Sequence, residues 1–254
     1  MLVSGKKALI FGVANDRSIA YAIAKIFKNQ GASIALNFVN AAIRKRVEPI
    51  NEELGGDFIF PCDVTKDEEI ASAAQIVAEK WGGVDILVHS VAFANRDDLA
   101  GRYVDTSRAG FALALDVSCY SLVTLCKAFE PQMSEGGSVM ALSYYGAEKV
   151  IPNYNVMGVA KAALEASVRY LSVDMGARGV RVNAISSGPL KTLASSGISG
   201  MKQIFKHVED RAPLKRNVTQ EDAAGLALFL ASDFSTCITG ETIYVDAGYN
   251  IMGM

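Results

Sequence analysis

The sequence has few of the residues that build disulfide frameworks or histidine metal sites. Its 254 residues include only four cysteines and two histidines. So few cysteines, none in a C-x-x-C pair, exclude a disulfide scaffold, and we expect reduced, mostly buried thiols. Neither His89 nor His207 stands near a carboxylate at ligand spacing. The sequence therefore predicts no metal site.

Basic blocks and long apolar segments are also missing. Lys and Arg number 25 against 27 Asp and Glu, giving a net charge of -2, and no basic run is long enough to follow a phosphate backbone. The start of the chain lacks the basic and apolar regions of a signal peptide, and later apolar stretches stop well short of the ~18 residues that a membrane span requires. We therefore expect a cytoplasmic protein with neither a nucleic-acid nor a membrane partner.

Hydrophobic residues are abundant. They make up 50% of the chain against 20% charged residues, which is enough for a large core. Short apolar runs alternate with amphipathic segments throughout, as in a parallel sheet covered by helices on both faces. The length suits one such domain. We predict a single doubly wound, Rossmann-type α/β domain over residues 1–254, with about seven strands.

The hydrophobic pattern locates the individual elements. Predicted strands are 7–12, 33–38, 58–62, 85–90, 137–142, 181–186 and 242–245, and predicted helices are 18–29, 43–54, 65–81, 107–134, 153–176 and 219–232. Thr65 followed by Glu68 predicts a capping box, and Thr219 is expected to cap the last helix. The segment 189–213 is too long for a simple crossover, so we predict a mobile flap at about 190–210 with an apolar helix face; an ordinary packed surface helix fits the same periodicity.

The first predicted strand runs into a turn and then a helix. Gly12 permits a tight turn, and the start of the following helix at Ser18 and Ile19 offers N–H groups to a pyrophosphate. The later glycines of G-x-G-x-x-G are absent, and a lone glycine at such a turn is more often only a turn. The signal gains weight only in combination with others.

The ends of two further predicted strands supply that combination. The Asp63 carboxylate, followed by Val64, could accept a hydrogen bond from an adenine amino group, and the small residues around Val91 would let a ribose or nicotinamide approach. Each could equally be a helix cap or a packed side chain. Because ligands lie across the carboxyl edge of such sheets, their grouping with Gly12 favours a dinucleotide site.

A tyrosine and a lysine seven residues apart, Tyr154 and Lys161, fall in the predicted helix 153–176. This spacing puts them two turns apart on one helix face. A phenol can donate to a developing oxyanion, and a lysine can hold ribose hydroxyls while its charge favours a strongly donating phenol. Taken alone, the pair could simply be exposed on a helix.

The chain resembles the short-chain dehydrogenase/reductase superfamily over nearly its whole length. Within it the chain is similar to the bacterial NADH-dependent enoyl-acyl-carrier-protein reductases, through residues 12–20, 144–148, 151–158, 179–186 and 188–189. The resemblance implies hydride transfer from NADH to the β-carbon of a trans-2-enoyl thioester on an acyl carrier protein, in fatty-acid biosynthesis, by a homotetramer. Alternatives are a carbonyl-reducing dehydrogenase and a non-catalytic dinucleotide-sensing module.

The spacing between the tyrosine and the lysine distinguishes an enoyl reductase from a carbonyl-reducing dehydrogenase. Carbonyl-reducing members carry Tyr-x3-Lys with a Ser thirteen residues before the Tyr; here those positions are Met157 and Tyr144. The phenol is one turn earlier, at Tyr154. Reduction of an enoyl thioester leaves charge on an oxygen further from the carbon that receives the hydride, so the donor must move with it.

The resemblance also implies a set of site residues. The implied catalytic residues are Tyr144, Tyr154 and Lys161. The implied NAD-binding residues are Gly12, Ser18, Ile19, Val39, Asp63, Val64, Val91, Lys161, Leu190, Thr192 and Ala194. The implied substrate-binding residues are Ala94, Tyr144, Tyr154, Met157, Met201, Ile204 and Phe205. The end of the second predicted strand has neither an acidic residue nor an immediate basic pair, and we expect NADH to be preferred over NADPH.

Overall fold

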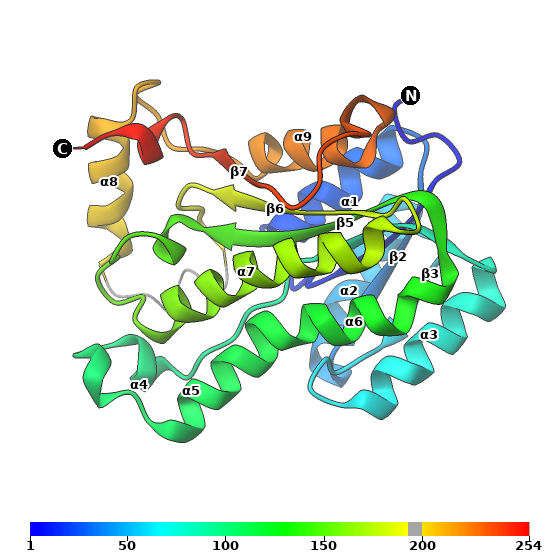
Figure 1. Ribbon diagram of the computed structural model, residues 1–254, viewed down its shortest axis with the longest axis horizontal. Coiled ribbons are helices and arrows are strands. Elements are labelled where there is room, and N and C mark those ends of the chain that lie inside the picture. The colour runs from blue at the N-terminus through cyan, green and yellow to red at the C-terminus, as the bar shows by residue number, and fades with distance from the viewer. Residues whose placement is uncertain (193–199, 254) are drawn as a thin grey trace.

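The computed structural model describes residues 1–192 and 200–253. Within them, seven strands form one parallel sheet in the order β3-β2-β1-β4-β5-β6-β7 (Figure 1). The chain winds outward from β1 to β3, then returns to place β4 on the other side of β1. The predicted doubly wound sheet is confirmed, and the β1–β4 junction is the switch point where such sheets bind ligands.

The elements have the following bounds in the described residues. The strands are β1 Lys7–Phe11, β2 Ser33–Phe38, β3 Phe58–Pro61, β4 Val84–His89, β5 Met133–Tyr144, β6 Arg181–Ser187 and β7 Thr242–Val245. The α-helices are α1 Ile19–Asn29, α2 Ala41–Leu54, α3 Asp67–Trp81, α4 Arg96–Leu99, α5 Arg108–Leu115, α6 Ser121–Phe129, α7 Val156–Gly176, α8 Met201–Arg211 and α9 Gln220–Ala231. A π-helical turn, Asp116–Tyr120, joins α5 to α6, and a 3-10 turn, Tyr145–Ala147, follows β5.

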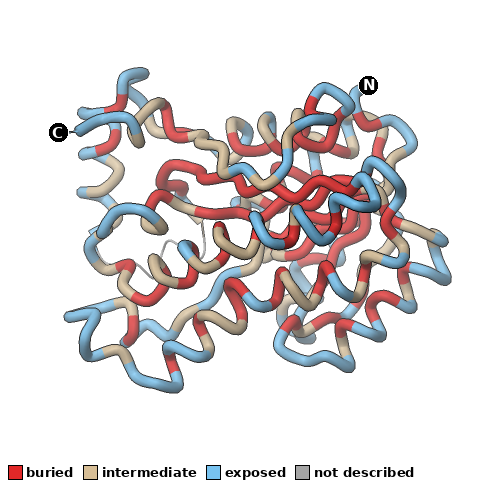
Figure 2. The backbone as a smooth tube through the Cα atoms, in the orientation of Figure 1, coloured by how far each residue is buried: buried red, intermediate tan, exposed pale blue. Residues whose placement is uncertain are grey.

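Two hydrophobic cores lie on opposite faces of the sheet. Successive side chains of a strand point to opposite faces, so Leu9 of β1 enters the core under α3, α6 and α7, whereas Ile10 enters the core under α1, α2 and α9. Figure 2 shows the central strands buried along most of their length. Burial on both faces explains why these strands are continuous apolar runs rather than alternating ones.

The predicted helix 107–134 is confirmed as one helical run, Arg108–Gln132, but its geometry and its end differ from the prediction. A π-helical turn joins α5 to α6, α6 ends at Phe129, and a 3-10 turn containing Pro131 leads into β5 at Met133. Proline has no N–H to continue the helical ladder. Contrary to the expectation that the apolar stretches stop well short of a membrane span, the run Arg108–Gln132 is long and apolar enough to cross a membrane by length and composition; half of its most apolar window is buried inside the protein.

The two predicted helix caps have different outcomes. The predicted cap at Thr219 is confirmed, and the structure shows that it forms a capping box with Asp222 as the reciprocal partner. The one at Thr65 is wrong: α3 begins at Asp67, and the Thr65 hydroxyl donates instead to the Asp63 carboxylate at 2.8 Å. Because the helix starts two residues later than predicted, Lys66 rather than Thr65 occupies the N-cap position. The cysteines are all free, three of them buried, as expected.

Candidate functional site

The turn after β1 is built around a glycine that no other residue can replace. Gly12 has a φ of +102°, and a Cβ there would lie 2.1 Å from the carbonyl oxygen of Ser90. The ends of β1 and β4 therefore approach closely only because position 12 has no side chain. Ser18 caps α1 with its backbone alone, since its side chain donates to the Asn15 carbonyl and makes no capping bond. This leaves the helix start open to an anion.

Asn37 fastens this turn to its neighbours, a role that the sequence pattern does not reveal. Its Oδ1 accepts from the Gly12 N–H at 2.9 Å, and its Nδ2 donates to the Cys62 carbonyl at 3.2 Å. One buried amide therefore connects the carboxyl ends of β1, β2 and β3. The only available signal is a polar residue inside an otherwise apolar strand.

The other predicted cofactor residues lie along the same edge. Val64 is buried just after β3, Val91 is half-buried just after β4, and Val39 is exposed after β2. Burial pushes the pKa of Asp63 upward, but hydrogen bonds from Thr65 outweigh this, so its pKa falls below the ordinary value and the carboxylate stays charged. Two more residues follow β6, Leu190 buried and Thr192 half-buried, whereas Ala194 lies outside the described residues.

The phenol predicted to be catalytic does not lie on the helix that carries Lys161. α7 begins at Val156, so Tyr154 belongs to the turn before it, and the prediction of one shared helix face is wrong. Asn153 and Asn155, on either side of Tyr154, have positive φ values of 62° and 37°, which curl the chain ahead of the helix. Asparagine tolerates this backbone region better than most residues, and the periodicity of a helix carries no such signal.

Tyr154 is nevertheless brought together with three of the other predicted substrate residues, Ala94, Tyr144 and Met157. Its side chain is buried in a small apolar cluster with Met157, and Ala94 and Tyr144 pack against that cluster. The rings of Tyr144 and Tyr154 meet edge to face, with centroids 5.0 Å apart. Burial raises the pKa of Tyr154, so its phenol stays protonated, and burial raises the pKa of Tyr144 to about 12.

Two glycines make room for this phenol. A Cβ on Gly146 would lie 2.5 Å from the Tyr154 ring, and a Cβ on Gly158 would lie 2.7 Å from the Gly146 carbonyl oxygen. Real contacts of this kind essentially never occur, so either substitution must move the turn or the ring. Gly146 and Gly158 are thus part of the site although they contribute no functional group.

Lys161 is buried at the carboxyl end of β5. Its Nζ donates to the Leu142 carbonyl at 2.6 Å, and burial lowers its pKa to about 8, against the opposing effect of Glu165. The neighbouring carboxyl of Glu165 accepts from the Ser143 hydroxyl at 2.5 Å, and burial raises its pKa. Burial, followed by the charge on Lys161, lowers the pKa of His89 to about 3, so this imidazole is neutral.

The predicted flap residues lie apart from the Tyr154 cluster. Ile204 on α8 packs beside Val208 and Leu190 in a separate apolar cluster. Phe205 is half-buried, with the Lys191 ammonium over its ring at 5.5 Å, and Met201 at the start of α8 is half-buried. The apolar helix face is confirmed, and residues 193–199 of the predicted flap lie outside the described residues.

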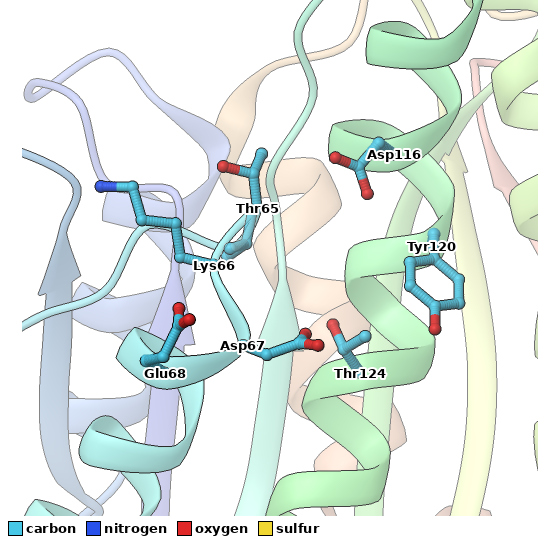
Figure 3. Close-up of a pocket in the computed structure, with 8 residues that line it drawn as sticks. Thr65, Lys66, Asp67, Glu68, Asp116, Tyr120 and Thr124 are labelled. Carbon is cyan, nitrogen blue, oxygen red and sulfur yellow. The ribbon is translucent and has the colours of Figure 1, made fainter.

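An open polar pocket of about 340 Å³ lies elsewhere, between the start of α3 and the π-helical turn with α6 (Figure 3). Its lining residues are Val64, Thr65, Lys66, Asp67, Glu68, Asp116, Tyr120 and Thr124. Only Val64 among them belongs to the predicted cofactor site, and neither Tyr154 nor Lys161 reaches it. Across the described part of the chain, no group of three or more His, Cys, Asp or Glu residues could hold a metal ion.

Comparison with known proteins agrees over the full chain. The sequence is 54% identical over 252 residues to the NADH-dependent enoyl-[acyl-carrier-protein] reductase of Rickettsia typhi, covering 99% of this chain and 97% of that protein. The structure matches the enoyl-acyl-carrier-protein reductase of Anaplasma phagocytophilum in complex with NAD, with a TM-score of 0.97, 51% identity and coverage of 100% and 97%. The Aquifex aeolicus NADH enzyme matches with a TM-score of 0.97, 48% identity and full coverage of both chains.

A family profile gives the same assignment. The profile described as Enoyl-(Acyl carrier protein) reductase matches residues 12–250, a span that begins at the Gly12 turn and includes Tyr144, Tyr154 and Lys161. The match therefore covers the whole of the site described above and nearly all of the fold. The chain belongs to the enoyl-(acyl-carrier-protein) reductase family.

Proposed function

We propose that this chain reduces a trans-2-enoyl thioester carried on an acyl carrier protein, with NADH as the hydride donor, in the last reductive step of fatty-acid elongation. The observation that carries the proposal is the buried phenol of Tyr154, held one turn before the position of the catalytic tyrosine in carbonyl-reducing relatives. That position is filled here by Met157, which has no proton to donate. Carbonyl reduction is therefore disfavoured.

The residues at the sheet edge fit a nicotinamide dinucleotide. The bare backbone at Gly12 and the uncapped start of α1 offer N–H groups to the pyrophosphate. The charged Asp63 carboxylate stands where an adenine amino group can donate to it, and the Lys161 ammonium can turn from the Leu142 carbonyl to ribose hydroxyls. The cofactor, when bound, supplies the hydride. Ser18, Ile19, Val39, Val64, Val91, Leu190, Thr192 and Ala194 complete the proposed set.

Tyr154 acts as hydrogen-bond donor to the thioester oxygen. Negative charge develops there when the β-carbon accepts a hydride, and a protonated phenol in a water-poor cluster stabilises it strongly. One such donor is worth ~3 kcal/mol of barrier. The raised pKa matters because an ionised phenolate could not donate. Tyr144 and Met157 wall the acyl chain, with Ala94 beside them.

The remaining parts of the proposal concern the assembly. One dinucleotide-binding and catalytic domain spans residues 1–254, and α8, with Met201, Ile204 and Phe205, belongs to a flap at about 190–210 that closes over the acyl chain. The proposed location is the cytoplasm, and the proposed assembly is a homotetramer. The assembly is supported by exposed apolar side chains along α5 to α7, where Tyr170 and Val173 are 78% and 77% exposed. Large apolar side chains so exposed favour a covering neighbour.

Oxidation of NADH in the presence of paired substrates tests the reaction type. A crotonyl thioester, as crotonyl-CoA or on an acyl carrier protein, should support loss of NADH absorbance, and the matching acetoacetyl thioester should not. Both offer the same chain length, so only the group that is reduced differs. Turnover of the acetoacetyl thioester alone would contradict the proposal and favour a carbonyl reductase.

A further inference from the structure

The backbone at Asn155 adopts a conformation that favours glycine. Its φ is 37° and its ψ is −116°, close to the first central position of a type II′ turn. Non-glycine residues in such regions are strained and persist only where surrounding contacts hold them. Glycine would relieve that strain without any steric conflict. The asparagine side chain must therefore contribute something that glycine cannot.

The contribution is a link to a different part of the chain. The Asn155 Nδ2 donates to the carbonyl oxygens of Ala100 and Gly101 at 3.3 Å and 3.2 Å, in the loop that follows α4. These partners are 55 and 54 residues away in sequence. Figure 1 shows α4 and α5 beside the start of α7. The amide therefore ties the turn before α7 to the α4–α5 loop.

The two ends of that loop are held by hydrogen bonds, which makes it a suitable anchor. The buried Asp98 carboxylate accepts from the Ser107 N–H at 3.0 Å and from the Asn95 side chain at 3.2 Å. Ser107 in turn caps α5 by accepting from the Gly110 N–H at 2.9 Å. Gly110 leaves the space for the carboxylate, because a Cβ there would lie 1.8 Å from Asp98 Oδ2.

The turn at Asn155 connects the anchored loop to the Tyr154 phenol. The Met157 N–H donates to the Tyr154 carbonyl and the Gly158 N–H to the Asn155 carbonyl, each at 2.9 Å, so the backbone on both sides of Asn155 is fixed to the first turn of α7. The only Asn155 side-chain donor points at the α4–α5 loop. A change of a few tens of degrees at Asn155 would swing the Tyr154 ring within its cluster.

We propose that Asn155 is a positioning residue, whose amide bonds to Ala100 and Gly101 hold the strained turn that aims the Tyr154 phenol at the substrate oxygen. The proposal rests on the donor role proposed for Tyr154. Asn155 touches neither cofactor nor substrate in this account. Its effect on the reaction passes entirely through Tyr154.

Asn155→Gly separates positioning from folding. Glycine can adopt this backbone conformation without strain, but without the amide it is no longer held there, so the turn becomes freer to move. The melting temperature should therefore change little, while the single-turnover rate of enoyl reduction falls ~10-fold because the phenol is less well placed. The Kd for NADH should not change. Asn155→Ala removes the amide and keeps the strain, so it should lower both the melting temperature and the rate. Lys215→Gly, at an exposed left-handed position with φ 51°, is the matched control and should leave the rate unchanged.

A double-mutant cycle with Tyr154→Phe tests whether Asn155 affects the rate through Tyr154. If Asn155 acts through Tyr154, Asn155→Gly should cost ~10-fold in the wild type and almost nothing in the Tyr154→Phe background. An equal loss in both backgrounds, or no loss in the wild type, overturns the inference and leaves the proposed function intact. A Tyr154→Phe enzyme as fast as the wild type removes the proposed donor role itself, and this inference with it.

Discussion

Replacing Lys161 with methionine should raise the thermal stability of the ligand-free protein and abolish its affinity for NADH. The lysine is 5% exposed, and burial lowers its pKa from 10.5 to about 8. At about 1.4 kcal/mol per pKa unit, the fold disfavours the charged form by about 3 kcal/mol. Methionine has similar length and carries no charge, so it avoids this penalty.

The pH dependence gives the sign of the effect. Below pH 8 the lysine is protonated in both the folded and unfolded states, and the full penalty is present. Between about pH 8 and about pH 10.4 the unfolded state binds more protons than the folded state, so the stability of the wild type rises with pH. The advantage of Lys161→Met is therefore largest at pH 7 and shrinks through this window.

The net gain is smaller than the penalty because a hydrogen bond is lost. Lys161 donates to the Leu142 carbonyl, and such a bond contributes ~1.5 kcal/mol. About 1–2 kcal/mol remains, which for a chain of this size raises the melting temperature by roughly 2–8 °C. Scanning calorimetry at pH 7, with and without NADH, measures both effects, and exposed Lys149→Met is the control. A melting temperature that falls for Lys161→Met, or a retained NADH-induced rise, would refute the reasoning.

Three further predictions concern the phenol, the cofactor and the flap. Gly146→Ala should lower the rate of enoyl reduction at least ~10-fold, because the added Cβ would lie 2.5 Å from the Tyr154 ring. Gly176→Ala, whose added Cβ would have no atom within 4 Å, should leave the rate unchanged, and steady-state kinetics of both variants test this. NADH should have a higher kcat/KM than NADPH. The Arg44 guanidinium on α2 lies over the Phe38 ring at the end of β2, where the adenosine ribose would bind, so Arg44→Ala should reduce any NADPH-dependent rate and leave the NADH-dependent rate unchanged. Hydrogen exchange in α8, Met201–Arg211, should slow when cofactor and an acyl ligand bind together; slow exchange that ligands leave unchanged points to an ordinary packed helix.

The arrangement of strands could be predicted from the sequence because it depends on local pattern. Each buried strand is an apolar run, and the carboxyl ends of parallel strands meet at one edge, so Gly12, Asp63 and Val91 could be grouped without coordinates. The π-helical turn at Asp116–Tyr120 could not be predicted, because the apolar periodicity continues across it. The sequence also does not indicate that the Thr65 hydroxyl donates to the nearby Asp63 carboxylate.

The site was less predictable where it depends on the sign of a backbone φ angle or on hydrogen bonds to residues far away in the sequence. Tyr154 and Lys161 were placed on one helix because their spacing allows it, and nothing in the spacing indicates the positive φ values at Asn153 and Asn155. Asn37 bonds to residues 25 positions away on either side, so its role becomes visible only when three strands are assembled. Such polar side chains are the ones that position a site without taking part in its chemistry.

Single-turnover reduction of a crotonyl thioester by Tyr154→Phe is the most direct test of the central claim. With NADH prebound, the variant lacks only the phenolic hydroxyl, so the rate of hydride transfer should fall ~10²-fold, as expected for loss of one oxyanion donor. The Kd for NADH, measured by calorimetry on the same preparation, should match the wild type because Tyr154 lies in the apolar cluster with Met157, where the acyl chain is proposed to bind. A hydride-transfer rate equal to that of the wild type would contradict the account.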